Sequence, residues 1–366
     1  MASSSSTPST QSYELQTKPH EYSGETLMSY YYRNPTPRGV IFYSHGVLEH
    51  TRCHMFNIEF FIRNGFSVFA LDLPGHGLSA KGKVDNTIKD WRAVIAHWSA
   101  FIREISQEEC HQNIPKFYFG HSLGATVGIL VVRQVKDLLT GAIFSAPTVF
   151  VNAPGIAVAF LGPLSVVAKG VGVQKLDRTT LCHDAAIIKA ANEDPLCGQK
   201  AINAQTANEI KHMTEEIKKH PEQDDYPFFI FHGDKDAIAP FKNSQMFFEK
   251  AVSKTKTLHI FQDTFHEIHN EPCKQECQGM ILDWINRRIS EDALKSSKEN
   301  EAKSKAEESE SKEGEGENEP KKEEEEEGKK ESEQSKDVAD AETTAATGSE
   351  KSAEEVKSEE KEATSS

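Results

Sequence analysis

A serine between two glycines stands at the boundary of an apolar run and a helical pattern. Gly120-His121-Ser122-Leu123-Gly124 follows the run 116–119 and precedes apolar residues at helical spacing. In a G-x-S-x-G turn between a strand and a helix, the serine hydroxyl projects toward a base that can remove its proton. Glycine has no Cβ, so the strand and the helix can approach closely at positions 120 and 124. The segment predicts a nucleophilic serine at Ser122.

An acid and a base follow at the ends of two later apolar runs. Asp236 comes shortly after the run 225–231, and His266 comes shortly after the run 257–261. A histidine can take the proton of a serine hydroxyl, and a carboxylate can orient that histidine and stabilise its charged form. The chain order serine, aspartate, histidine, with each residue after a strand, is typical of one class of such triads. We therefore expect Ser122, Asp236 and His266 to be the catalytic residues.

The acid and the base each have a neighbour that could replace them. Asp234 lies just before Asp236, and His269 lies just after His266. We prefer His266 as the base because it lies sooner after the strand, whereas we expect His269 to enter the final helix. The residue pattern alone does not decide whether Asp234 or Asp236 is the catalytic acid.

The charge of the chain is concentrated at its carboxyl end. Residues 291–366 hold 27 acidic and 13 basic residues and so carry almost all of the net charge of −15. This segment has no aromatic residue and few large aliphatic ones, so it cannot bury enough apolar surface to offset the entropy of ordering. We expect a disordered acidic tail whose partner the sequence does not identify. A basic nucleic-acid footprint is absent, so no nucleic-acid partner is expected.

The cysteines favour a reducing compartment. They are Cys53, Cys110, Cys182, Cys197, Cys273 and Cys277. They form no C-x-x-C pair, and no apolar signal segment follows Met1, so we expect a cytoplasmic protein. Cys273 and Cys277 lie near two histidines, but they have helical spacing and no matched second pair, which favours structural thiols. Neither a metal nor a cofactor is expected.

Apolar runs alternate with helical patterns along most of the chain. The expected strands are 27–32, 39–43, 66–71, 116–119, 141–147, 225–231 and 257–261, and the clearest helices are 54–63 and 88–105. Near-continuous apolar strands of this kind indicate an α/β fold with a mainly parallel sheet, helices on both faces and a site at the carboxyl ends of the strands. We expect an unordered lead over 1–20 and a core over 21–147 and 222–290.

The segment 148–221 interrupts this alternation and is too long for a loop, so we expect an inserted, mostly helical cap. Its part 153–168 has no charge and is interrupted by Gly and Pro. A membrane span would need about twenty uninterrupted apolar residues. Two other interpretations of this stretch are a buried core helix and an apolar lid over the site. We favour the lid, and we expect Val158 and Leu161 to contact the substrate. Such a lid could also touch a membrane surface.

Four motifs together resemble those of a known family. They are Ser44-His45-Gly46-Val47-Leu48-Glu49-His50, Gly75-His76-Gly77, Gly120-His121-Ser122-Leu123-Gly124 and Asn192-Glu193-Asp194-Pro195-Leu196. On the basis of these motifs, residues 21–290 resemble the monoacylglycerol lipase and lysophospholipase branch of the α/β-hydrolases. Relatives often continue the serine motif as G-H-S-M-G-G, where this chain has Leu123 and Ala125.

The resemblance implies a serine hydrolase that cleaves carboxylic esters of lipids, most of all monoacylglycerol. It assigns the oxyanion hole to the backbone N–H groups of Val47 and Leu123, and it selects Asp236 because the family pattern G-x-x-D starts at Gly233. Glu49 and His50 would brace a loop. The alternatives are a lysophospholipase, a short-chain carboxylesterase, a peptidase of the same fold, and a non-catalytic scaffold that acts through its acidic tail.

Overall fold

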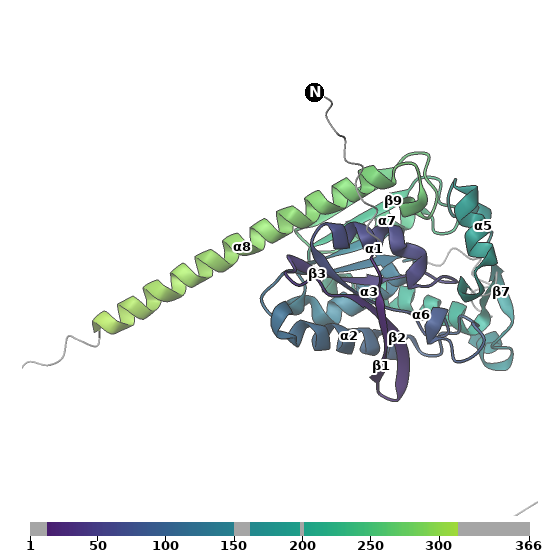
Figure 1. The fold of residues 1–366 in the computed structure, drawn as a ribbon, viewed down its shortest axis with the longest axis horizontal. Coiled ribbons are helices and arrows are strands. Elements are labelled where there is room, and N and C mark those ends of the chain that lie inside the picture. Colours follow the sequence, from purple (N-terminus) through teal and green to yellow (C-terminus); the bar gives the residue numbers. More distant parts are fainter. Residues whose placement is uncertain (1–12, 150–161, 198–200, 314–366) are drawn as a thin grey trace, which may run out of the picture. The chain divides into compact units, whose positions relative to one another are not determined.

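The computed structural model describes residues 13–149, 162–197 and 201–313 (Figure 1). The chain divides into two units, Met1–Ala306 and Glu307–Ser366. The first unit contains the sheet, the helices around it and the cap. Only residues 307–313 of the second unit are described, and they belong to the last helix.

One sheet dominates the first unit. Within the described residues, eight strands form it in the order β1-β2-β4-β3-β5-β6-β9-β10. The strands are β1 (Gln16–Tyr22), β2 (Glu25–Tyr32), β3 (Gly39–Ser44), β4 (Phe66–Leu71), β5 (Lys116–His121), β6 (Gly141–Ser145), β9 (Phe228–Gly233) and β10 (Lys256–Phe261). From β4 to β10 all neighbours in this sheet are parallel, whereas β2 pairs antiparallel with both β1 and β4. The predicted α/β fold with a mainly parallel sheet is confirmed.

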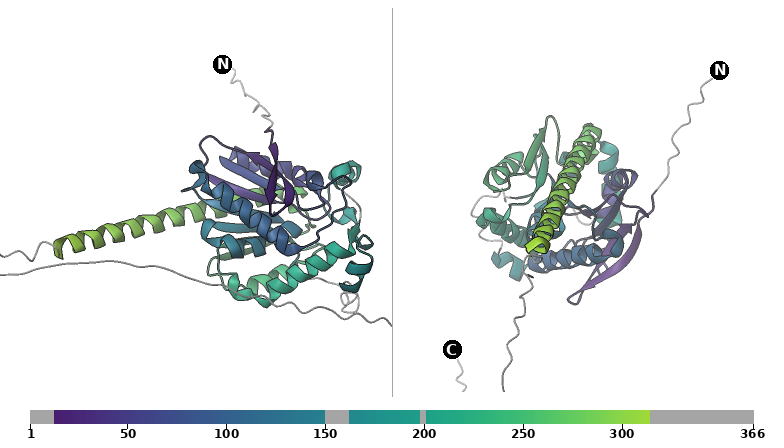
Figure 2. Two further views of the ribbon diagram at one scale, coloured as in Figure 1. Left: turned by 90° about the horizontal axis from the view of Figure 1, so that it is seen from below. Right: turned by 90° about the vertical axis from the view of Figure 1, so that its left-hand side faces the viewer.

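The sheet is buried on both faces, which is why its central strands are almost entirely apolar. Val40 and Phe42 of β3 belong to one core cluster, whereas Ile41 and Tyr43 belong to the other. The helices α2 (Trp91–Gln107), α3 (Leu123–Val135), α6 (Ala204–Lys219) and α7 (Phe241–Lys250) supply the first cluster, and α1 (Met55–Arg63) and α8 (Lys274–Glu313) supply the second. Figure 2 shows these helices as layers around the sheet.

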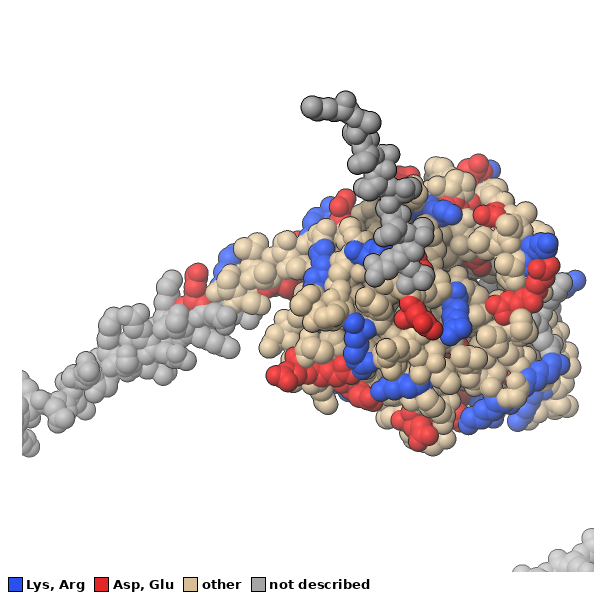
Figure 3. Space-filling model, in the orientation of Figure 1, with Lys and Arg blue, Asp and Glu red and all other residues tan. Residues whose placement is uncertain are grey.

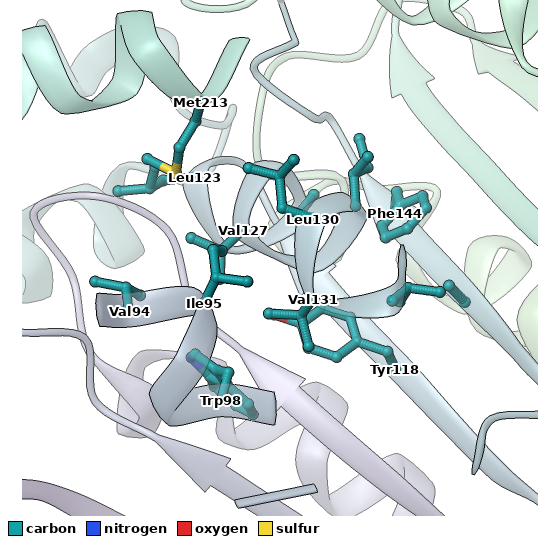
Figure 4. Close-up of a cluster of buried hydrophobic side chains, with 14 of the residues drawn as sticks. Val94, Ile95, Trp98, Tyr118, Leu123, Val127, Leu130, Val131, Phe144 and Met213 are labelled. Atoms are coloured by element: carbon teal, nitrogen blue, oxygen red, sulfur yellow. The ribbon is translucent and has the colours of Figure 1, made fainter. Parts of the chain in front are cut away.

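In the first cluster, α3, the helix after Ser122, packs against its neighbouring helices and strands. Figure 4 shows side chains of α2, α3 and α6 meeting beside β5 and β6. Val94, Ile95 and Trp98 of α2 are buried in this cluster together with side chains of α3. Trp98 also meets the ring of Tyr118 edge to face, with ring centroids 5.6 Å apart. Trp98 is therefore a core residue.

The amino-terminal end differs from the expectation. The lead was predicted to be unordered through residue 20, but Gln16–Tyr22 form β1 at the edge of the sheet. Its one buried side chain is that of His20, whose Nδ1 lies 2.8 Å from Nε2 of His97 in α2. Pro19 is tolerated because an edge strand pairs on only one side. Because the only buried residue of β1 is a histidine, its sequence does not show the alternation of apolar and polar residues that predicts a strand.

An insertion separates β6 from β9, as the length of the pattern break predicted. Its described part contains α5 (Ala185–Glu193), α6 and a small antiparallel sheet of β7 (Gly172–Lys175) and β8 (Ala201–Asn203). Val158 and Leu161, the predicted substrate contacts, lie outside the described residues. The described end of the uncharged stretch exposes Val166 and Val167 at 71% and 87% of their surface. These two residues are therefore not part of a core.

The last helix crosses the predicted start of the tail at residue 291. Its first turns pack Cys277, Ile281, Trp284 and Ile285 into the second cluster. Beyond these turns the helix continues to Glu313 with exposed residues such as Leu294. Alanine, lysine and glutamate are strong helix formers, so this composition supports a helix without a buried face. The acidic segment therefore begins as a helix.

The surface of the body carries both signs of charge. On the face shown in Figure 3, Lys and Arg are interspersed with Asp and Glu. Among the residues that the structure describes, no helix combines the length and the apolar character needed to cross a lipid bilayer.

Candidate active site

Ser122 occupies a strained turn between β5 and α3. Its backbone has φ 52° and ψ −118°, a conformation that residues with a side chain rarely adopt. The backbone N–H of Ser122 donates to the carbonyl of Ser145 in β6 at 2.8 Å, so the neighbouring strand holds the turn. Strained backbone of this kind persists only where the surroundings fix it, and it is common at functional sites. The turn has the geometry predicted from G-x-S-x-G.

The two glycines of the motif are sterically required. A Cβ atom on Gly120 would lie 2.5 Å from the carbonyl oxygen of Gly124. A Cβ atom on Gly124 would collide with the carbonyl oxygens of Ser44 and His45 at the end of β3. Both distances are far below a van der Waals contact. The predicted close approach of strand and helix is confirmed at both positions.

Asp236 and His266 meet beyond the carboxyl ends of β9 and β10. Nδ1 of His266 lies 2.6 Å from Oδ2 of Asp236, and both side chains are buried. The other carboxylate oxygen, Oδ1, accepts hydrogen bonds from the backbone N–H groups of Ile238 and Ala239, both at 2.8 Å. Nε2 of His232 also lies 2.9 Å from Oδ2. The carboxylate is thus fixed at both oxygens and directed at one nitrogen of His266.

The electrostatics of this pair favour a charged imidazole. Burial raises the pKa of Asp236, but the charges of His266 and His232 and their hydrogen bonds outweigh it and hold the pKa below its ordinary value. Burial lowers the pKa of His266, but the charge and the hydrogen bond of Asp236 raise it above its ordinary value. The aspartate therefore stays ionised at neutral pH, and it stabilises the imidazolium that forms when His266 accepts a proton.

The two competing residues have other partners. Oδ1 of Asp234 accepts a hydrogen bond from the backbone N–H of Thr264 at 3.2 Å, so this side chain braces the loop after β10. His269 is buried between the rings of His54 and His121, with centroids 4.7 and 4.9 Å away. Burial lowers the pKa of His269 well below its ordinary value, which keeps the ring neutral. The structure pairs Asp236 with His266 and places Asp234 and His269 in structural contacts.

A cavity of about 400 Å³ joins the serine to the histidine. Ser122, His266 and Val47 all line it. Among the described residues, no hydrogen bond connects the Ser122 hydroxyl to His266; such bonds are often long in unliganded enzymes and shorten when substrate binds. The apolar part of the wall comes mainly from the cap. It includes Leu176, Leu181, Ile187 and Leu196, together with Ile238 of the core.

The loop after β3 lies directly against the nucleophile. A Cβ atom on Gly46 would lie 3.0 Å from the Cβ of Ser122, so the backbone of this loop borders the reacting hydroxyl. The N–H of Gly46 donates to Oε1 of Glu49, which fixes the turn before Val47. Leu123 is the first residue of α3, and the first N–H groups of a helix have no partner within it. Val47 lines the cavity that contains Ser122, and Leu123 follows Ser122 directly; the role of their N–H groups as oxyanion donors remains a prediction.

Buried polar contacts brace this loop and connect it to the cap. Oε1 of Glu49 lies 2.9 Å from Nε2 of His54, and both residues belong to the core. Nε2 of His50 lies 3.0 Å from Oδ2 of Asp194, which belongs to the cap. These contacts agree with the loop-bracing role that the resemblance implied for Glu49 and His50.

Two buried ionisable residues beside the cavity were not among the predicted site residues. Arg178 of the cap donates to the carbonyl oxygens of Ala191 and Cys197, both at 2.9 Å, and so holds the cap segment together. Glu267 follows the proposed base, and Oε2 of Glu267 accepts a hydrogen bond from Asn270 at 2.7 Å. Burial raises the pKa of Glu267 to about 7, and the nearby charge of Glu49 adds to the rise. No local pattern marks either residue, because their burial depends on distant segments.

Comparison with known proteins agrees with this architecture. The chain is 24% identical to a monoacylglycerol lipase of Mycolicibacterium smegmatis over 68% of its own length and 88% of that protein. It is 25% identical to a monoglyceride lipase of Homo sapiens over 77% of its own length and 93% of that protein. The crystal structure of Paleococcus ferrophilus monoacylglycerol lipase superposes with a TM-score of 0.63 at 25% identity, covering 72% of this chain and 99% of the other.

A family profile places the chain more firmly than any single relative. The profile described as serine aminopeptidase, S33, matches residues 35–273. This match includes the turn at Ser122, the pair of Asp236 and His266, and the cap between them. Because it spans more than half of the chain, the chain belongs to this family of α/β-hydrolases.

Proposed function

We propose that the protein is a serine hydrolase that cleaves monoacylglycerol into fatty acid and glycerol. The observation that carries the proposal is the 2.6 Å contact between His266 and Asp236, which lies beside the cavity that contains Ser122. The named lipases among the relatives support the choice of substrate. The triad of Ser122, His266 and Asp236 supports serine-hydrolase chemistry, and the apolar part of the cavity wall supports a lipid substrate.

The reaction proceeds through an acyl-enzyme. His266 takes the proton of the Ser122 hydroxyl while the serine oxygen attacks the ester carbonyl. The N–H groups of Val47 and Leu123 stabilise the resulting oxyanion, and one such donor is typically worth a factor of about 10²–10³ in rate. His266 then protonates the leaving glycerol. Water hydrolyses the acyl-enzyme by the same steps in reverse, and Asp236 stabilises the charged imidazole throughout.

The cavity and the cap favour a lipid acyl chain. Cap residues such as Leu176, Leu181 and Ile187 give one side of the cavity an apolar wall. Each buried CH₂ group contributes about 0.8 kcal/mol, so such a wall rewards longer chains. Val158 and Leu161 lie outside the described residues, and we propose that they also contact the acyl chain. The exposed Val166 and Val167 belong to the same uncharged stretch and give the cap a surface that contacts lipid at the periphery of a membrane.

A second candidate is a peptidase, because the matching family is described as serine aminopeptidase, S33. Both activities would use the same triad, so only the substrate separates them. The test is a panel of monoacylglycerols of graded chain length, a lysophospholipid, p-nitrophenyl esters and amino-acid p-nitroanilides. We expect turnover to be highest on long-chain monoacylglycerol. Preferential cleavage of the anilides would establish the peptidase instead, and preference for the lysophospholipid would establish a lysophospholipase.

The control for this panel is Ser122→Ala. It should abolish turnover of every substrate and labelling by a fluorophosphonate, while circular dichroism stays unchanged, because one hydroxyl adds little to stability. If wild-type protein neither turns over any substrate nor takes up the label, the fold serves as a non-catalytic scaffold. Retention of a tenth of the activity in the variant would show that Ser122 is not the nucleophile.

A further inference from the structure

Two short turns bring together, at the wall of the cavity, four side chains of the types that can ligate a metal ion. His50 and Cys53 come from the loop after β3, and Asp194 and Cys197 come from the cap. One ligand atom of each lies within 4.8 Å of the ligand atoms of the other three. The two pairs are 144 positions apart in the chain, so only the fold assembles the cluster.

The two turns have the same construction. The N–H of Cys53 donates to the carbonyl of His50 at 3.0 Å, and the N–H of Cys197 donates to the carbonyl of Asp194 at 3.2 Å. Each turn therefore presents its first and fourth side chains on one side, and the two turns face each other. The other oxygen of Asp194, Oδ1, accepts a hydrogen bond from the N–H of Leu196 at 2.8 Å. This bond orients the carboxylate so that Oδ2 points at His50.

The distances match those between ligands of one tetrahedral ion. With Zn–S bonds of about 2.3 Å and Zn–N or Zn–O bonds of about 2.0–2.1 Å, two sulfurs lie about 3.8 Å apart and an N–O pair about 3.4 Å apart. Here the sulfurs of Cys53 and Cys197 are 3.5 Å apart, and Nε2 of His50 is 3.0 Å from Oδ2 of Asp194. Small side-chain movements would bring all four to the bonding distance.

We infer that His50, Cys53, Asp194 and Cys197 bind one Zn²⁺ ion that connects the cap to the core. Two thiolates and an imidazole select a soft divalent cation over Mg²⁺ or Ca²⁺, which prefer oxygen ligands. With four protein ligands the ion has no open position, so it is structural and does not activate water. His50 and Cys197 are buried, whereas the Asp194 side chain is 34% exposed and gives the ion a route from solvent.

The site differs from the expectation of no metal, which considered only Cys273, Cys277 and the neighbouring histidines. Its consequence is mechanical. His50 follows the Gly46–Val47 segment beside Ser122, so a bound ion would hold that loop and the cap segment 194–197 in one arrangement. The inference does not depend on the substrate of the enzyme.

The test uses the full-length, reduced protein after removal of metal by a chelator. Zn²⁺ is titrated in competition with a chromophoric chelator, and Co²⁺ is titrated as a spectroscopic probe, because thiolate ligation gives a near-ultraviolet charge-transfer band. We expect one equivalent of Zn²⁺ to bind, a Co²⁺ band that indicates two thiolates, and a rise of several degrees in Tm on adding Zn²⁺, since a ligand that binds only the native state stabilises it.

Variants locate the ion. Cys53→Ser and Cys197→Ser should each weaken Zn²⁺ binding at least tenfold and remove the rise in Tm, and Asp194→Asn should weaken it less. Cys273→Ser is the matched control, because Cys273 is partly buried, like Cys53, but lies outside the cluster. This variant should bind Zn²⁺ like the wild type. Circular dichroism of each variant checks its fold, and the Co²⁺ band of the wild type tests thiolate ligation without any variant.

Three results would overturn the inference. The first is absence of stoichiometric Zn²⁺ binding by the reduced wild-type protein. The second is unchanged binding in both Cys53→Ser and Cys197→Ser, and loss in Cys110→Ser would then assign the ion to the group of Glu108, Cys110 and His111. The third is a Co²⁺ complex without the thiolate band. A Cys53–Cys197 disulfide in protein that binds no Zn²⁺ after reduction would mean that the pair has a redox role instead.

Discussion

Nδ1 of His266 lies 2.6 Å from Oδ2 of Asp236, although the two residues are 30 positions apart in the chain. Parallel pairing of β9 with β10 brings their following loops to the same edge of the sheet. The contact links the protonation of the base to the charge of the acid. It therefore makes a prediction about pH as well as about rate.

Replacing Asp236 by Asn should lower kcat by about 10⁴, as loss of the orienting carboxylate does in serine proteases. It should also move the acidic limb of the kcat/KM profile to lower pH. The base must be neutral to act, and Asp236 raises the pKa of His266 above its ordinary value, so removing the carboxylate lowers that pKa. Asp234→Asn is the matched control and should keep the profile. An unshifted limb in Asp236→Asn would show that another acid controls the base.

His266→Ala should reduce turnover nearly as much as Ser122→Ala, and combining the two should add little, because residues of one triad act as a unit. His269→Ala should affect stability more than turnover. Its ring is buried against His54 and His121, so its removal leaves a cavity and lowers Tm. Steady-state kinetics and thermal unfolding of His266→Ala and His269→Ala compare the effects on kcat and on Tm. The reverse ranking in kcat would make His269 the base.

Glu267→Gln should raise Tm near pH 8 and leave it nearly unchanged near pH 4. Burial raises the pKa of Glu267 to about 7, well above its ordinary 4.5. The folded state thus holds the proton more tightly than the unfolded state, and stability is lost as pH rises from the ordinary value through the folded one. Glutamine cannot ionise and can still accept the hydrogen bond from Asn270.

The control for Glu267→Gln is Glu276→Gln, which removes an exposed carboxylate from the first turn of α8 and should change Tm little at either pH. Differential scanning calorimetry at both pH values gives the comparison. A gain that is equal at the two pH values would mean that the variant acts through packing and not through the proton.

The sequence predicted those parts of the site that depend on local pattern. Strands such as β3 and β9 are buried at every residue and so read as apolar runs, and the turns that follow them carry the reactive groups. The turn at Ser122 was predicted from the two glycines around it, where no Cβ atom would fit. Strand β1 escaped prediction because its buried residue is a histidine and its pattern contains Pro19.

Contacts between distant segments could not be predicted in this way. Arg178 is buried because carbonyl groups of the cap converge on its guanidinium, and it carries no motif. Cys53 and Cys197 each look like an isolated thiol, and only the packing of the cap against the core places their sulfurs 3.5 Å apart. Burial of this kind is decided by tertiary structure and leaves no periodic signal in the sequence.

Deleting residues 291–366 should leave Tm and turnover of a short ester unchanged. The side chains of α8 that enter the core end before this point, and Leu294 beyond it is 60% exposed. An acidic segment without aromatic residues has little to pack against the body. Thermal unfolding and p-nitrophenyl butyrate hydrolysis of the shortened protein test this. A large drop in either would show that the tail docks on the enzyme.

The cap gives the most demanding prediction. Replacing Val158 and Leu161 by Asp should depress turnover of long-chain monoacylglycerol and binding to neutral vesicles much more than turnover of a soluble acetate or butyrate ester. If these residues contact the acyl chain, as we propose, the charges would remove a gain of about 0.8 kcal/mol per buried CH₂ group, whereas the triad on the sheet would be untouched. Val252→Asp, at an exposed valine outside the cap, is the matched control and should leave both activities intact. Equal losses on long and short substrates, with circular dichroism unchanged, would place the acyl site elsewhere and favour a carboxylesterase.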